Sequence, residues 1–292
     1  MLLNFLKLIR VQQWIKNVFV FVPLLFSHNL FEREYFLITL FAFFVFCLAS
    51  SAIYVINDLI DIEADRAHPL KKNRPLPSGA ISKPTSVITF IVILIIIGVL
   101  LPNFNYDFII CVASFIILNV LYTFYFKHIV VLDVFSIAAG FTLRVLAGAF
   151  VLSIPISSWL ILTTMFISLF LGVMKRHSEL TLTPEDENSS SRKVLAKYSL
   201  NFADQMATVA AAGVIICYAL YTVADRTVSV FNTENLIYTT PFVVFGIFRY
   251  MYLEYMSNGG ENTTKIIATD SPMIVTVILY IITTVLIIYN II

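Results

Sequence analysis

Long apolar runs alternate with short polar connections along almost the whole chain. The runs are about 17 to 24 residues long, which is the length that an α-helix needs to cross a hydrocarbon layer of about 30 Å. The pattern therefore predicts an all-α, polytopic membrane protein. Nine spans are expected, at residues 14–31, 36–56, 86–102, 107–126, 130–152, 158–174, 206–224, 236–254 and 272–291.

The basic residues of the connections are distributed very unevenly. One alternating set of connections, which begins with the N-terminal segment, holds fifteen Lys and Arg residues, and the other set holds only Arg33 and Arg226. By the positive-inside rule the first set is cytoplasmic, so that the N-terminus lies inside and the C-terminus outside. The two long connections, 57–85 and 175–205, both fall on the inner side. We therefore expect an active site that opens to the cytoplasm.

Composition supports a membrane protein and excludes a disulfide framework. The chain has 292 residues, of which 59% are hydrophobic and 13% are charged, whereas about a quarter of the residues of a soluble domain are charged. Cys47, Cys111 and Cys217 lie inside apolar runs without CxxC spacing, which is typical of small core residues. We expect one integral-membrane domain over residues 1–292, with membrane lipids around it and no nucleic-acid partner. A homo-oligomer stays open.

An acidic segment, "NDLIDIEAD", follows the second span. If the helix continues through residue 65 at about 100° per residue, Asp58, Asp61 and Asp65 share one face with Asn57, and Glu63 lies on the opposite side. Acids at a helix C-terminus repel one another and also meet the negative end of the helix dipole, so a cation has to stabilise them. Ligands that are all oxygen atoms suit Mg²⁺.

A basic tail, "KKNRPLPSG", follows the acids directly. Lys71, Lys72 and Arg74 stand within ten residues of Asp65, and the Pro and Gly residues return the chain toward the membrane. A metal on one side and basic groups on the other are what a diphosphate requires. The bland alternative is a solvated loop of balanced charge, and the regular spacing of the three Asp residues argues against it.

These residues carry a family resemblance. "NDLIDIEAD" resembles the NDxxDxxxD signature of the UbiA superfamily of intramembrane prenyltransferases, and "NRPLPSG" resembles the segment that follows it there. The resemblance implies nine transmembrane helices around a central cavity that is open to the cytoplasm and to lipid. It also implies that Asn57, Asp58, Asp61 and Asp65 bind Mg²⁺ and a diphosphate.

Four further regions resemble one branch of that family, the decaprenyl-phosphate phosphoribosyltransferases. They are "RVQQWIKN", "LDVFSIAAGFTLRVLAGA", the loop "KRHSEL…RKVLAKY" and "GGENTTKIIATDSP". Most UbiA members have a second aspartate-rich motif after the sixth span, and this chain does not. Its only clustered acids there, Glu185, Asp186 and Glu187, are consecutive and cannot share one helix face.

The branch implies a particular reaction. Phosphoribosyl pyrophosphate is the Mg²⁺-bound donor, and the phosphate of a polyprenyl (decaprenyl-type) lipid attacks the ribose anomeric carbon and displaces pyrophosphate. Both this donor and a prenyl diphosphate ionise toward a stabilised carbocation, so the metal can serve either. The extra phosphates need extra cations, which fits a site that is richer in Lys and Arg. The branch supplies an arabinan precursor for the cell wall.

Other basic residues are candidates for binding substrate phosphates. Lys16 and Lys127 lie at membrane boundaries, where a lysine is also a common interfacial anchor. Lys175 and Arg176 leave the sixth span on the inner side, and they either bind phosphate or follow the positive-inside rule.

Arg144 lies near the middle of the fifth span, where an unpaired cation costs from several to more than about 10 kcal/mol. It is expected to bind either a phosphate or a carboxylate of another helix, and to line a polar cavity with Asp133. Arg249 raises the same question. Tyr122 and Tyr198 are candidates for hydrogen bonds to phosphate or ribose, although Tyr is also common at membrane interfaces.

Two other functions stay open. The first is the usual UbiA reaction, transfer of a prenyl chain from a prenyl diphosphate to an aromatic or other acceptor. The second is a lipid transporter or flippase, which would show interrupted spans in repeated halves, and no such pattern is visible.

Overall fold

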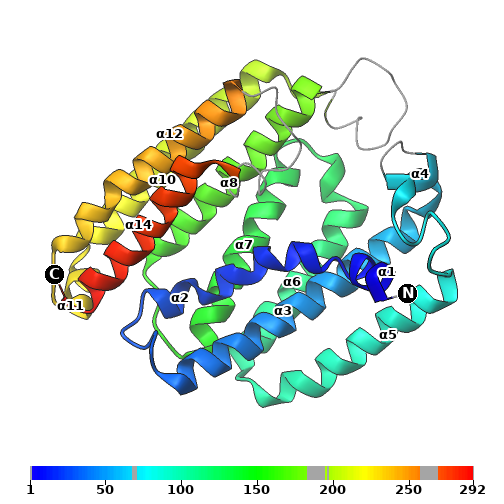
Figure 1. Cartoon of the computed structure of the whole chain (residues 1–292), viewed down its shortest axis with the longest axis horizontal. Helices are drawn as coiled ribbons and strands as arrows, with labels where there is room; N and C mark the ends of the chain where they lie inside the picture. The colour runs from blue at the N-terminus through cyan, green and yellow to red at the C-terminus, as the bar shows by residue number, and fades with distance from the viewer. Residues whose placement is uncertain (1, 68–70, 183–194, 196, 257–268, 292) are drawn as a thin grey trace. The chain divides into compact units, whose positions relative to one another are not determined.

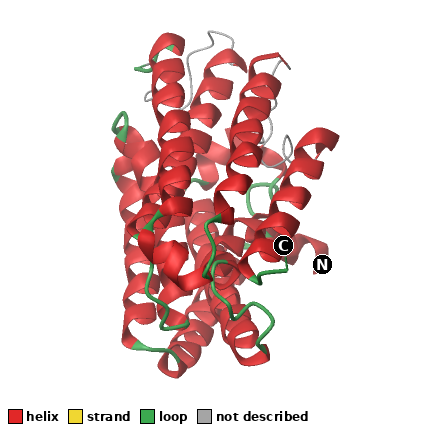
Figure 2. Cartoon of the chain, turned by 90° about the vertical axis from the view of Figure 1, so that its left-hand side faces the viewer, coloured by secondary structure: helices red, strands yellow, loops and turns green. Residues whose placement is uncertain are grey.

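The computed structural model describes residues 2–67, 71–182, 195, 197–256 and 269–291. Every regular element in these ranges is a helix, and they contain no strand (Figure 2). The prediction of an all-α protein is therefore confirmed. Two predictions concern residues outside the described ranges. One is that Glu185, Asp186 and Glu187 form no second metal motif, and the other is the resemblance carried by "GGENTTKIIA".

Contacts within the chain separate two compact units. Unit 1 comprises Met1–Leu24, Asn29–Lys127 and Leu143–Pro155, and unit 2 comprises Leu25–His28, His128–Thr142 and Ile156–Ile292. The boundary falls within helix α7 (Leu132–Val151), which contributes residues to both. The single domain over 1–292 stays a prediction.

Unit 1 is built on α3, the longest helix of the described residues. Its elements are α1 (Leu2–Leu8), the 3₁₀ helix η1 (Val11–Phe21), most of α2 (Val22–Leu25), α3 (Arg33–Ile60), α4 (Ile62–Ala67), η2 (Lys71–Asn73), α5 (Lys83–Leu100), η3 (Leu101–Asn103), α6 (Tyr106–Phe124), most of η4 (Phe126–His128) and the second half of α7. In Figure 1, α5 runs back alongside α3, and the two helices are in contact. Phe46 of α3 packs at 5.3 Å from Phe115 and 6.0 Å from Phe108, between ring centroids, at the centre of the core.

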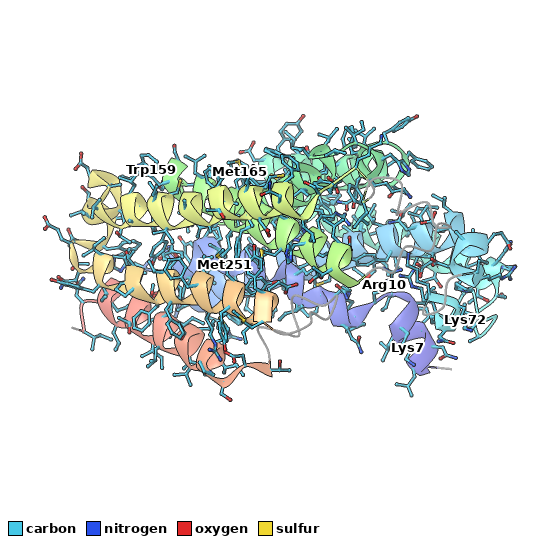
Figure 3. The ribbon with its side chains drawn as sticks, turned by 90° about the horizontal axis from the view of Figure 1, so that it is seen from above. Lys7, Arg10, Lys72, Trp159, Met165 and Met251 are labelled. Atoms are coloured by element: carbon cyan, nitrogen blue, oxygen red, sulfur yellow. The ribbon has the colours of Figure 1, made fainter. Side chains whose placement is uncertain are left out.

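Unit 2 is a group of long helices. It contains the first half of α7, α8 (Ser158–Leu182), α10 (Leu200–Val223), α11 (Asp225–Phe231), η5 (Asn235–Thr239), α12 (Thr240–Met256) and α14 (Ser271–Ile288). Figure 1 shows α12 beside α14, and α10 packs against α8 through a row of small residues that includes Ala203, Ala207 and Ala210. Small residues let membrane helices approach closely. Met165 of α8 and Met251 of α12, labelled in Figure 3, pack against the same core.

Eight helices of the described residues are long and apolar enough to cross a membrane. Their outer surfaces are apolar as well: on α5, for example, Ile88, Ile95 and Val99 are 61%, 60% and 68% exposed. The eight correspond to the second through ninth predicted spans. The first predicted span, 14–31, instead holds η1 and the short α2, so nine spans stay a prediction.

Two helix boundaries in the structure differ from the prediction. The sixth span was expected to end at residue 174, but α8 continues to Leu182, so Lys175 and Arg176 lie within the helix rather than beyond it. The predicted acidic face assumes that the helix of the second span continues through residue 65, but α3 ends at Ile60 and α4 begins at Ile62. The acidic segment therefore spans a helix break.

Candidate active site

The break at Asp61 preserves most of the expected helical register. Asp61 has φ −90° and ψ 11°, yet its N–H still donates to the Asn57 carbonyl at 2.9 Å, and the N–H of Asp65 donates to the Asp61 carbonyl at 2.8 Å. These i to i+4 bonds keep the side chains about where a continuous helix would place them. Asp58 and Asp65 are buried, at 2% and 3% exposure, whereas the side chain of Glu63 is 72% exposed.

Asp58 and Asp65 share one guanidinium group. Nη1 of Arg74 lies 2.5 Å from Asp65 Oδ2 and 3.3 Å from Asp58 Oδ1. Asp58 also accepts a hydrogen bond from Arg10, and Lys71 Nζ lies 3.9 Å from Asp65 Oδ1. The two buried carboxylates are thus neutralised by three basic side chains from the N-terminal segment and the basic tail.

Asp61 and Asn57 face α6 and the connection that follows it. Lys127 Nζ lies 3.9 Å from Asp61 Oδ2, and the hydroxyl of Thr123 donates to Asn57 Oδ1 at 2.8 Å. Tyr122, which precedes Thr123 on α6, is half-buried. The structure therefore brings Asn57, all three aspartates, Lys71, Arg74 and Lys127 of the predicted site residues together in unit 1.

The basic tail reaches the acids because it is anchored in a small apolar cluster. Leu76 is 1% exposed and packs with Leu8, Val55 and Ile62, which holds the tail against the end of α3. Gly79 then turns the chain with φ +78°, a conformation that side chains disfavour. Figure 3 shows Lys7, Arg10 and Lys72 at the same end of unit 1.

Glu63 belongs to a separate exposed pair. Its carboxylate lies 3.1 Å from Arg66 Nη1 and 3.9 Å from Lys83 Nζ. Within the described residues, neither ion pair of Glu63 reaches the buried aspartates, as its opposite helical position predicts.

The acid cluster fits a divalent cation in its chemistry. Three carboxylates face four basic groups among the described residues, those of Arg10, Lys71, Arg74 and Lys127. As arranged, no three His, Cys, Asp or Glu side chains of the described residues converge on one point where a metal would sit. However, Asp58 and Asp65 already bind one cationic group between them, and their oxygen atoms are the ligands that Mg²⁺ prefers.

Arg144 is buried in unit 1 with partners from two other elements. Its Nε donates to Asn17 Oδ1 at 2.7 Å, and its guanidinium carbon lies 4.5 Å from the centroid of the Phe115 ring. A carboxamide is thus one partner of Arg144, and the expected phosphate or carboxylate partner stays a prediction. Lys16 precedes Asn17 on η1 and is half-buried.

Asp133, Arg176 and Tyr198 form a buried cluster in unit 2. Arg176 Nε donates to Asp133 Oδ2 at 2.8 Å, and Arg176 also pairs with Glu179. The hydroxyl of Tyr198 donates to Asp133 Oδ1 at 2.7 Å and accepts from the N–H of Val131 at 2.8 Å. Burial and the hydrogen bond to Asp133 raise the pKa of Tyr198, so its hydroxyl stays protonated. Lys175 Nζ lies 3.7 Å from Glu179 Oε1.

Arg249 of α12 forms an ion pair with Asp270 at the start of α14. Arg249 donates to both oxygens of Asp270, at 3.1 and 2.8 Å, and Asp270 also accepts from the N–H of Met273 as the N-cap of α14. The hydrogen bonds from Arg249 hold the pKa of Asp270 below its ordinary value. Arg249 therefore joins two helices.

Several residues of these clusters were not predicted as site residues. Arg10 counted only as a cytoplasmic charge, although it opens the "RVQQWIKN" segment. Thr123 carried no signal of its own, because its importance depends on the distant Asn57 that it meets. Asn17 ends the "RVQQWIKN" segment, but nothing in that segment indicates that it meets Arg144. Asp133 was expected to line a polar cavity with Arg144 and was not matched to Arg176.

Comparisons with known proteins agree with the sequence motifs. The model of the UbiA prenyltransferase family matches residues 18–267. A curated decaprenyl-phosphate phosphoribosyltransferase of Mycolicibacterium smegmatis is 36% identical over 74% of this chain and 69% of its own length. One of Mycobacterium tuberculosis is 33% identical over 74% of this chain and 72% of its own.

Solved structures share the fold. A UbiA homolog from Archaeoglobus fulgidus bound to DMAPP and Mg²⁺ aligns over 99% of this chain and 100% of its own with a TM-score of 0.73 and 16% identity. A digeranylgeranylglyceryl phosphate synthase aligns over 99% of both chains with a TM-score of 0.64 and 21% identity. The chain belongs to the UbiA prenyltransferase family, and it is a transferase.

Proposed function

We propose that this protein transfers 5-phosphoribose from phosphoribosyl pyrophosphate to the phosphate of a polyprenyl lipid and releases pyrophosphate. The observation that carries the proposal is the set of four basic side chains on the row of three aspartates in unit 1. So many cations suit a donor with phosphate groups beyond its diphosphate. The names of the curated relatives support the same substrates.

In this proposal Asn57, Asp58, Asp61 and Asp65 would hold Mg²⁺, which supplies positive charge to the departing pyrophosphate. The basic side chains that pair with the aspartates are the groups that bind the donor. Arg10, Lys71, Arg74 and Lys127 turn from carboxylate to phosphate oxygens when the donor binds. Tyr122 and Lys16 are further proposed contacts to donor or lipid phosphates.

The transfer itself needs no protein nucleophile. A phosphate oxygen of the lipid forms a bond to the ribose anomeric carbon, and the bond from that carbon to the pyrophosphate oxygen breaks with its electron pair. The acceptor is already ionised near neutral pH, so no general base is required. The basic side chains stabilise the charge that gathers on pyrophosphate as the bond breaks.

Lys175 and Arg176 of unit 2 are proposed phosphate ligands as well. Asp133 with Tyr198 orients the Arg176 guanidinium. Tyr198 as a direct contact to phosphate or ribose stays a prediction. Arg144 as a phosphate ligand also stays a prediction.

The site is proposed to face the cytoplasm, with the N-terminus inside and the C-terminus outside. Phosphoribosyl pyrophosphate is a polyanion that cannot enter the membrane, so it has to approach from water, whereas the lipid acceptor arrives from the bilayer. Fifteen basic residues in one set of connections, against two in the other, support this orientation.

The experiment uses purified protein with Mg²⁺, decaprenyl phosphate and phosphoribosyl pyrophosphate labelled in the ribose. We expect the label to move to the lipid extract and pyrophosphate to be released in equal amount. The second candidate, transfer of a prenyl chain from a prenyl diphosphate, is favoured by the family and is tested in parallel with labelled geranyl diphosphate. Label in the lipid extract from the second donor alone would overturn the first proposal.

A further inference from the structure

η1 and α3 are joined by polar contacts that follow one another in order along both helices. At the start of η1, the guanidinium carbon of Arg10 lies 4.6 Å from the centroid of the Tyr54 ring. Further along, Nε1 of Trp14 donates to the Ser51 hydroxyl at 3.1 Å. The partners on α3 descend in number as those on η1 rise, so the two helices are antiparallel.

Asn17 makes the last and most connected step of this series. Its Oδ1 accepts from the Ser50 hydroxyl at 3.2 Å and from Arg144 Nε at 2.7 Å, and its Nδ2 donates to Cys47 Sγ at 3.3 Å. Asn17 itself is 0% exposed. One carboxamide therefore joins η1 to α3 and to α7.

Helix geometry explains why the contacts line up. A 3₁₀ helix has three residues per turn, so Trp14 and Asn17 lie on one face of η1. On α3, Ser51, Tyr54 and Asp58 are three and four residues apart and share a face. The same face of α3 thus carries both the contacts of η1 and the aspartate that Arg10 binds.

The buried guanidinium makes Asn17 hard to replace. Arg144 is 7% exposed, and a buried cation that loses a hydrogen-bond acceptor is destabilised strongly. The Oδ1 atom of Asn17 is an acceptor that η1 supplies to Arg144. Arg144 therefore fixes the position of Asn17, and Asn17 fixes the position of η1.

We propose that Asn17 is a positioning residue: by binding Arg144 it sets η1 along α3 and so places Arg10 against Asp58. Neither Asn17 nor Arg144 need touch the substrate for this. The structural part of the inference is independent of the reaction, and only its kinetic part rests on the proposed function.

Trp14 reports the position of η1, because its indole N–H is bonded to Ser51 and the chain has only one other tryptophan, Trp159. In a Trp159→Phe background we expect Asn17→Ala to shift the Trp14 emission toward that of Ser51→Ala, which breaks the bond directly. Asn17→Asp keeps an acceptor for Arg144 and is expected to retain the original spectrum. Gln12→Ala, at an exposed position of η1, is the matched control.

An unchanged spectrum in Asn17→Ala, or an equal shift in Asn17→Asp, would overturn the proposal. If Asn17→Ala does not fold, Asn17→Ser takes its place, because the serine hydroxyl is too short to reach Arg144 but stays polar. The same shift is expected in Asn17→Ser, and its absence counts against the proposal in the same way.

The kinetic measurement separates positioning from simple loss of stability. We expect Asn17→Ala to raise the KM for phosphoribosyl pyrophosphate about tenfold and to change kcat by less than about twofold. Asn17→Asp should keep the KM close to that of the unaltered protein. Arg10→Gln should raise KM similarly, and the double variant should add little, since both act through Arg10. Additive increases would refute the coupling. If the unaltered protein uses no phosphoribosyl pyrophosphate, the proposed function fails, and the fluorescence result still decides the inference.

Discussion

Among single residues, Arg74 has the most direct influence on the acidic row. Its guanidinium bridges two buried carboxylates that would otherwise repel each other, and it stands on a tail held in place by Leu76. The neutralising charge is therefore held close to both carboxylates. In the proposed reaction these carboxylates exchange the basic side chain for a metal–diphosphate pair.

The first prediction concerns the aspartates. Asp58→Ala, Asp61→Ala and Asp65→Ala should each remove nearly all turnover, because one lost oxygen ligand disorders the proposed metal–diphosphate pair. Glu63→Ala is the matched control, since its carboxylate contacts only Arg66 and Lys83 in the described structure. Initial rates with labelled donor measure the difference, and an equal loss in Glu63→Ala would contradict the assignment.

The second prediction concerns Arg74. A hydrogen bond to a charged group contributes about 1.5–3 kcal/mol, so Arg74→Gln should lower kcat/KM on the order of 10- to 100-fold. Arg66→Gln removes a guanidinium from the exposed pair with Glu63 and should change kcat/KM by less than about twofold. A comparable loss in both variants would show that overall charge, not the bridge, matters.

Among the elements, close helix contacts at small residues fix where the polar groups meet. Gly148 of α7 lies against the backbone carbonyl of Val20, at the end of η1, and an added Cβ there would also stand 3.2 Å from Pro23 Cδ. Only glycine permits this approach. The same contact keeps η1 in the position that its polar contacts with α3 require.

The third prediction tests that contact. Gly148→Ala should lower the free energy of unfolding by about 1–3 kcal/mol, because the backbones have to separate. Gly98→Ala, on α5, meets nothing within 4 Å and should be neutral or stabilising by up to about 1 kcal/mol, since alanine favours a helix over glycine. Thermal unfolding in detergent compares the two, and equal midpoints would refute the steric argument.

The fourth prediction uses the pair between α12 and α14. The depressed pKa of Asp270 means that the pair stabilises the protein fully above the ordinary pKa of 3.8, and that this is lost as pH falls through the lower folded value. Asp270→Asn keeps an N-cap for α14. Its unfolding midpoint should therefore lie below that of the unaltered protein near pH 7 and approach it below about pH 4.

A double variant checks the source of that effect. Arg249→Gln should lower the midpoint similarly, and combining it with Asp270→Asn should add little, because each change breaks the same pair. A gap between the midpoints that persists in acid would show that the carboxylate acts without its charge.

At the scale of the whole molecule, the protein is a set of helices whose outer surfaces are apolar and whose polar groups are gathered into a few internal clusters. The described cysteines are all buried. The uneven distribution of basic residues among the connections supports the proposed orientation, with the N-terminus inside.

The fifth prediction tests that orientation. Lys72 and Arg226 are both exposed but belong to the two opposite sets of connections. A membrane-impermeant maleimide should label Arg226→Cys in intact cells and Lys72→Cys only after the inner face is opened. The unaltered protein, with its buried cysteines, gives the background. Labelling of Lys72→Cys in intact cells would reverse the orientation.

The sequence alone determined the helical membrane class, the row of aspartates with its basic tail, and the family. These features depend on hydropathy and on the helical period, and both can be recognised within a window of about ten to twenty residues. The position of Glu63 on the opposite side followed from the same period, even though the helix breaks at Asp61.

Only the tertiary structure decided which charges meet. Arg10 and Asp58 are 48 residues apart, Arg176 and Asp133 are 43 apart, and Arg144 and Asn17 are 127 apart. Nothing in the local pattern of a buried arginine states whether its partner is a phosphate, a carboxylate or a carboxamide. The partner depends on which helices pack together. A buried polar group without a hydrogen bond is destabilising, so each one pairs with an acceptor on a neighbouring helix.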